Sequence, residues 1–91
     1  MEEHNHTHVH TKDVINRLSR ATGHLQAVKK MIEEHKDCSD VLIQLSAVKS
    51  ALNKIGQIIL KDHIEHCIVD AIQNDDKETL EKLMKAIERI V

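Results

Sequence analysis

Three residues of this 91-residue chain have side chains that could together bind a transition metal: Cys38, His63 and Cys67. His63 and Cys67 are four positions apart, so on a helix they lie on one face, one turn from each other. Thiolate sulfur and imidazole nitrogen are ligands that soft and borderline transition metals bind well. The pair forms half of a metal site, and Cys38 is the candidate third ligand.

Cys38 cannot reach the other two ligands within one straight helix. The apolar pattern predicts a helix over about residues 38–73, in which Cys38 and His63 are 25 residues, or about 37 Å, apart. The three side chains can meet where two copies of this helix pack antiparallel, because Cys38 of one chain then lies beside His63 and Cys67 of the other. Two-fold symmetry gives two equivalent sites in such a dimer.

The same pairing predicts where the two-fold axis crosses the helix. It lies beside Ala51, a small residue midway between Cys38 and the His63–Cys67 pair. We expect Val48 to face Ile55 of the partner subunit across this axis. The apolar residues thus support the pairing that the metal ligands require.

The elements that position these residues are predicted to be helices throughout. The chain has no Pro, two Gly and no Phe, Trp or Tyr, and 41% of its residues are apolar, which is typical of an all-α protein. Apolar residues recur at alternating steps of four and three along two long segments, a heptad pattern. We predict a three-helix subunit with helices over about residues 11–35, 38–73 and 77–91.

The middle helix indicates an oligomer. At about 35 residues it would be roughly 50 Å long, too long to be hidden within one small subunit, so its second apolar face is expected to pack on another chain. Residues 11–91 are expected to form a single helical domain. Thr11 is expected to cap the first helix, and Asp75, at capping-box spacing from Glu78, the third.

Several classes of protein are excluded by the composition. No apolar stretch approaches the roughly 18–20 residues that span a bilayer. The first ten residues, MEEHNHTHVH, are acidic and rich in His, unlike a signal peptide. Two cysteines without a secretory signal indicate a cytoplasmic protein with reduced thiols. The chain has no Gly-rich phosphate loop and no nucleophile elbow, so we do not expect an enzyme.

Residues 1–10 differ from the rest of the chain. They contain four alternating histidines and show no apolar periodicity. This composition predicts a flexible, His-rich tail. An alternative is that one or two of these histidines are metal ligands. The four residues are His4, His6, His8 and His10.

The ligand spacing and the segments around it are specific. Cys38 is followed by His63 after 24 intervening residues and by Cys67 after three more, among the segments NRLSRATGHLQAVKKM and CSDVLIQLSAVKSALNKI. From about residue 5 to residue 91 the chain closely resembles the CsoR/RcnR family of metal-sensing transcriptional repressors. The resemblance implies an all-helical subunit, a dimer-of-dimers tetramer, and DNA binding without a helix-turn-helix. It also implies that the metal-free tetramer binds an operator and that bound metal lowers this affinity.

The identity of the metal has two candidates. The Cys-His-Cys set resembles that of the copper branch of the family, which uses these residue types as a trigonal Cu(I) site. Two thiolates and one imidazole also suit Cu(I) on chemical grounds. The alternative is Ni(II) or Co(II), because His6 lies 32 residues before Cys38. This spacing is similar to that of an N-terminal histidine in the nickel- and cobalt-sensing branch, and His6 would give Ni(II) a fourth ligand.

Charge is distributed unevenly along the chain, whose formal total is −2. Residues 12–61 carry nine basic and five acidic residues, whereas residues 62–91 carry four basic and eight acidic residues. The basic segment is the candidate surface for the phosphates of double-stranded operator DNA. The resemblance points to Arg17, Arg20 and Lys49. Further candidates are Lys29, Lys30 and Lys54.

A second class of function stays open on the residues alone. It is a helical metal buffer or chaperone that uses the same site and the His-rich tail but never binds DNA. The basic segment lies on the same helices as the ligands, which favours the DNA-binding sensor. Gel retardation of the DNA upstream of the gene, with and without metal, separates the two.

Overall fold

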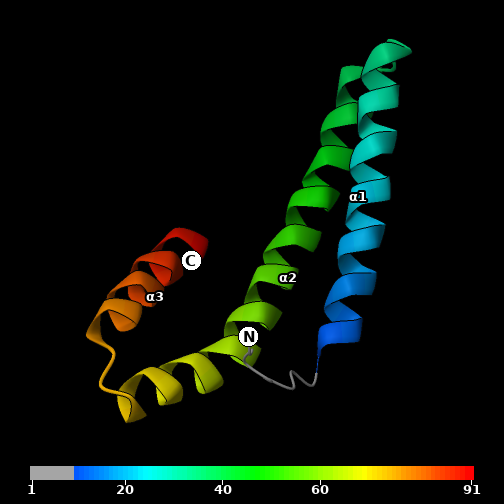
Figure 1. The fold of residues 1–91 in the computed structure, drawn as a ribbon. Helices are drawn as coiled ribbons and strands as arrows, with labels where there is room; N and C mark the ends of the chain where they lie inside the picture. The colour runs from blue at the N-terminus through cyan, green and yellow to red at the C-terminus, as the bar shows by residue number, and fades with distance from the viewer. Residues whose placement is uncertain (1–9) are drawn as a thin grey trace. The chain divides into compact units, whose positions relative to one another are not determined.

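The computed structural model describes residues 10–91, which form three α-helices and no strand (Figure 1). The helices are α1 (Thr11–Glu33), α2 (Cys38–Gln73) and α3 (Lys77–Ile90). The all-α, three-helix prediction is confirmed, and α1 ends two residues earlier than expected. The predicted tail, with His4, His6 and His8, lies outside the described residues except for His10. No helix in residues 10–91 is long and apolar enough to cross a membrane.

The end of α1 is determined by the backbone of His35, which is left-handed with φ of 57°. The His35 N–H donates to the Ile32 carbonyl at 3.1 Å, and the Lys36 N–H donates to the Met31 carbonyl at 2.9 Å. These two bonds form a Schellman motif, which closes a helix at a left-handed residue. The apolar pattern cannot show such a backbone change, and it therefore overestimated the length of α1.

The cap of α3 is Asp76, so the prediction of Asp75 was wrong. Asp75 has φ of 52° and donates its N–H to the Ile72 carbonyl, which makes it the left-handed residue that ends α2. The Asp76 carboxylate accepts hydrogen bonds from the Thr79 Oγ1 at 2.6 Å and the Thr79 N–H at 3.1 Å. These bonds lower the pKa of Asp76 below 3.8, so the cap is fully formed at neutral pH and is lost as pH falls through this lowered value.

The helices contribute to two compact units, one formed by Thr11–Ile55 and the other including Gly56–Val91. α2 runs without a break through both units. The expectation of a single domain over residues 11–91 stays a prediction.

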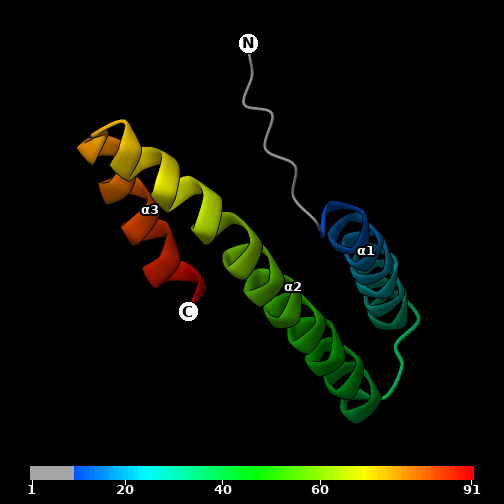
Figure 2. The same cartoon turned by 90° about the horizontal axis from the view of Figure 1, so that it is seen from below.

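The first unit is an antiparallel hairpin of α1 and the N-terminal half of α2, which lie side by side in both ribbon views (Figures 1 and 2). Its core consists of Ala21 and Val28 on α1 with Val48 and Ile55 on α2, none of them more than 5% exposed. The two residues of each pair are seven positions apart, so they occupy the same position in successive heptads. Val48 and Ile55 are already packed within their own chain, so the expectation that they meet across a dimer axis was wrong.

A second heptad row on each helix stays exposed. It consists of Leu18, Leu25 and Ile32 on α1 and of Leu45 and Leu52 on α2, between 37% and 61% exposed. Equivalent heptad positions of two antiparallel helices lie on the same side of the pair, so the two rows form one surface, here called the apolar face. This face, and not the Ala51 side, is an exposed apolar surface of the single chain.

In the second unit, α3 packs along the C-terminal half of α2. Gly56 and Ala71 of α2 are buried in this unit, and Leu80, Leu83 and Ile87 of α3 are half-buried. Gly56 allows the close approach, because a Cβ at this position would lie 3.1 Å from the Ile90 Cγ1. α3 therefore covers the stretch of α2 that carries two of the predicted metal ligands.

Candidate metal ligands and basic hollow

Cys38 is the first residue of α2 and is exposed. Asp37 caps this end of the helix: its Oδ2 accepts a hydrogen bond from the Ser39 N–H at 3.1 Å, and its carbonyl accepts one from the Val41 N–H at 3.1 Å. The cap makes Cys38, at the tip of the hairpin, part of an ordered helix end. The positive end of a helix dipole suits an anionic metal ligand such as a thiolate.

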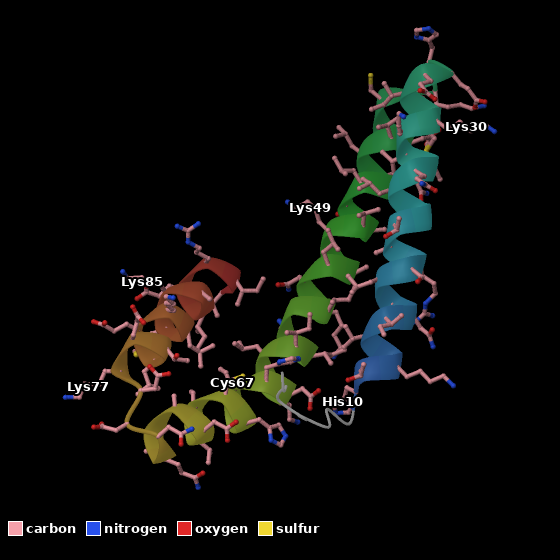
Figure 3. All side chains as sticks on the ribbon, viewed as in Figure 1. His10, Lys30, Lys49, Cys67, Lys77 and Lys85 are labelled. Carbon is pink, nitrogen blue, oxygen red and sulfur yellow. The ribbon has the colours of Figure 1, made fainter. Side chains whose placement is uncertain are left out.

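His63 and Cys67 lie one turn apart on α2 in the second unit, and both are half-buried. This confirms that they share a helix face. Cys67 is labelled in Figure 3. His63 borders a cavity of about 250 Å³ between α2 and α3. The other lining residues are all apolar: Gly56, Ile59, Leu60, Ile64, Leu83, Ala86, Ile87 and Ile90. One side of the imidazole thus borders a cavity with an apolar lining.

The described residues 10–91 of one chain do not assemble a complete metal site. Among the side chains that the structure describes, no group of three His, Cys, Asp or Glu residues is placed to hold a metal ion. Cys38 belongs to the first unit, and His63 and Cys67 belong to the second. His6, the proposed fourth ligand for nickel, lies outside the described residues. Two thiolates and one imidazole are a donor set that suits a soft metal.

A second feature lies on the hairpin, on the side opposite the apolar face. It is an open hollow of about 210 Å³, here called the basic hollow. It is lined by Arg17, Arg20, Ala21 and His24 of α1 and by Ala51 and Ile55 of α2. The Arg17 Nε donates to the Asp13 Oδ2 at 3.0 Å, an exposed pair of the kind worth only about 0.3–0.5 kcal/mol, so Arg17 is readily available to another anion.

The wall of the basic hollow contains a contact that the sequence did not reveal. The His24 Nε2 and the Gln44 Oε1 are 2.7 Å apart, which ties α1 to α2. His24 lies seven residues after Arg17, so heptad spacing places both on one side of α1. That spacing was visible in the sequence, but the partner on α2 was not.

The predicted DNA-contacting lysines differ in position. Lys54 follows Ala51 by three residues and lies on the side of α2 that borders the basic hollow. Lys49 points away from the hairpin contact, as does Lys30 on the other helix (Figure 3). Neither of them, nor Lys29, lines the hollow. Arg17 and Arg20 are the two predicted contacts that the structure brings together.

The sequence matches the family described as "Metal-sensitive transcriptional repressor" over residues 10–89. The chain belongs to this family. Its members include a relative from Bacillus subtilis strain 168, the copper-sensing transcriptional repressor CsoR, which is 39% identical over 85 residues. That match covers 86% of this chain and 84% of the relative. The copper-sensing repressor RicR of Mycobacterium tuberculosis is 41% identical over 68 residues, covering 74% of this chain and 71% of the relative.

Two solved structures share the fold of this repressor. The nickel-responsive transcriptional regulator InrS superimposes with a TM-score of 0.71 at 37% identity, covering 97% of this chain and 100% of the other. The copper-sensing repressor CsoR with Cu(I) from Geobacillus thermodenitrificans NG80-2 gives a TM-score of 0.79 at 33% identity, covering 98% and 92%. The family and its metal-responsive repressor function are therefore confirmed as predicted.

Proposed function

We propose that this protein is a Cu(I)-responsive repressor whose metal site forms between two chains. The observation that carries the proposal is the division of the ligands: Cys38 is exposed at the hairpin tip, whereas His63 and Cys67 share a face elsewhere on α2. Antiparallel association through the apolar face brings Cys38 of one chain to His63 and Cys67 of the other. Two relatives and one solved structure are described as copper-sensing repressors, which supports copper as the metal of this protein.

The donor set accounts for the choice of metal. Cu(I) is well satisfied by two thiolates and one imidazole, and these three donors require no ordering of the N-terminal residues. Cys38 and Cys67 would hold the ion as thiolates, and His63 as a neutral imidazole. His63 would hold the ion beside the apolar lining of the cavity between α2 and α3.

The coupling to DNA follows from the position of Cys38 on the hairpin. The same hairpin carries the basic hollow with Arg17 and Arg20, so a bond from Cys38 to the partner chain constrains the element that contacts DNA. Metal and DNA then favour different arrangements of the two hairpins. Bound metal therefore lowers the affinity of the protein for DNA, and bound DNA lowers its affinity for the metal. We infer a homodimer that pairs into a tetramer in the cytoplasm, with double-stranded operator DNA as its partner.

Gel retardation tests this function directly. We expect the metal-free protein to retard the duplex upstream of its own gene, and stoichiometric Cu(I) to release that duplex. Absence of retardation at any salt concentration, together with tight Cu(I) binding, would instead identify a metal buffer or chaperone.

Arg17→Ala should weaken DNA binding without changing metal binding. Loss of one phosphate contact lowers the slope of log affinity against log salt by about 0.9 for each copy in contact with DNA. Arg17 lies in the basic hollow and is not a metal ligand, so the Cu(I) affinity should stay within about twofold. Arg89→Ala on α3 removes the same charge elsewhere and serves as the control. An unchanged salt slope in Arg17→Ala would remove Arg17 from the DNA contacts.

Nickel is the second candidate, because the nickel-responsive regulator InrS matches 97% of this chain. Ni(II) commonly takes four ligands in a square-planar set, and His6 would supply the fourth. Under the copper proposal, His6→Ala should leave metal-driven release of DNA unchanged. A loss of response in His6→Ala, with a square-planar nickel absorption spectrum in the parent protein, would establish nickel instead.

A further inference from the structure

The His24–Gln44 contact has no role in the metal site, and it lies in the wall of the basic hollow. The hollow combines two guanidinium groups and one imidazole with a floor of small and apolar side chains, Ala21, Ala51 and Ile55. A volume of about 210 Å³ has room for a tetrahedral oxyanion and for bridging waters. Arg20 has no ion-pair partner among residues 10–91, so its charge is available to such a ligand.

The hydrogen bond to Gln44 limits what the His24 ring can offer to an anion. With the Nε2–H donated to the Gln44 Oε1, a neutral ring has only an acceptor at Nδ1. Phosphate oxygens are acceptors as well, so a neutral His24 gives them no hydrogen bond. A protonated ring keeps its bond to Gln44 and also presents an Nδ1–H donor. An anion in the hollow therefore favours the protonated form.

We propose that the basic hollow seats one backbone phosphate of double-stranded DNA, and that His24 takes up a proton when the phosphate enters. This inference rests on the proposed DNA-binding function and identifies a third contact in that site. Gln44 is a positioning residue, because its hydrogen bond to Nε2 fixes the His24 ring. Nδ1 is then the ring atom that gains or loses the proton. The DNA affinity of the repressor then depends on pH as well as on metal.

The charged groups around His24 are compatible with this role. On α1 they are Arg17, Arg20 and Asp13, and Asp13 is paired with Arg17 at 3.0 Å. On α2 they are Asp40, one turn before Gln44 on the same side, and Lys54 near the opposite end of the hollow. Basic groups outnumber acidic ones, so an entering phosphate meets a net positive site. The phosphate offsets the added charge on His24.

The test measures the affinity of the metal-free protein for the upstream duplex at pH 6 and pH 8 over a series of salt concentrations. In the wild type, binding at pH 6 should be tighter by at least about tenfold for each hollow in contact. The slope of log affinity against log salt should also be steeper at pH 6 by about 0.9 per hollow. In His24→Gln, whose amide can still donate to Gln44, both differences should disappear.

Two controls make the result specific to His24. His66→Gln changes a histidine in the other unit and should keep both differences. The ¹⁵N resonances of the His24 ring should change to the protonated pattern when the duplex is added at pH 7.5. If inorganic phosphate alone at millimolar concentration gives the same pattern, the hollow is a site for free phosphate and the DNA assignment is wrong.

The failures of the two proposals are distinguishable. A wild type that retards no DNA at either pH overturns the proposed function. A wild type that binds DNA through Arg17, with the same dependence on pH in His24→Gln, overturns only the role of His24.

Discussion

An equal mixture of Cys38→Ala and Cys67→Ala chains, unfolded and refolded together, is expected to bind Cu(I) although neither variant does so alone. The physical reason is the division of ligands between chains. In a mixed dimer, the Cys67→Ala chain supplies Cys38 to the intact His63 and Cys67 of the other chain. The second site of that dimer lacks both thiolates. Half of the dimers are mixed and hold one site of two, so about a quarter of the wild-type sites should return.

The measurement is a titration of Cu(I) against a competing chelator, which counts sites as well as affinity. The control mixes Cys38→Ala with a chain that carries both substitutions, because no pairing of these chains restores Cys38. A site formed within one chain would give no recovery in either mixture, and this outcome would refute the inter-subunit arrangement. Metal-driven release of DNA should be lost in each single variant and should return in proportion to the recovered sites.

Much of the fold could be predicted because helix formation here depends on local patterns. The periodicity of apolar residues and the lack of Pro predicted all three helices, and the start of α2 at Cys38 and its end at Gln73 agree with the structure. The errors occurred at helix ends. His35 and Asp75 adopt left-handed backbone, which is common for Gly and uncommon for these residues, so the sequence carried no clear signal of the turns.

The features of the candidate site that could be predicted were also those that depend on local sequence patterns. The His63–Cys67 pair depends only on spacing within one helix, and the structure confirms its shared face. The side of α2 that faces a partner chain could not be predicted. A heptad pattern has two apolar positions, and the sequence does not show which of them packs against α1 and which stays exposed. α1 buries Val48 and Ile55, and this leaves Leu45 and Leu52 for a partner. The His24–Gln44 contact joins residues 20 apart and required the hairpin to be known.

The exposed apolar row predicts that Leu52→Glu dissociates the protein. Leu52 is 46% exposed in the single chain and lies at the level of the helix where the two-fold axis is expected. Symmetry places two such glutamates close together in an apolar interface, and leaving a buried charge uncompensated costs about 3–5 kcal/mol. The dissociation constant of the dimer should rise by roughly two to three orders of magnitude. Sedimentation velocity over a range of protein concentrations measures this change.

Asn53→Glu is the matched control, because it places the same charge one residue further along α2, on an exposed side away from the apolar face. Its mass in solution should equal that of the wild type. Circular dichroism should show helix content retained in both variants, since the hairpin core of Ala21, Val28, Val48 and Ile55 is untouched. Dissociated Leu52→Glu should also lose tight Cu(I) binding, although none of its three ligands has been changed. A monomeric Leu52→Glu that keeps the wild-type Cu(I) affinity would show that one chain suffices for the site, and the proposed coupling through paired hairpins would then fail with it.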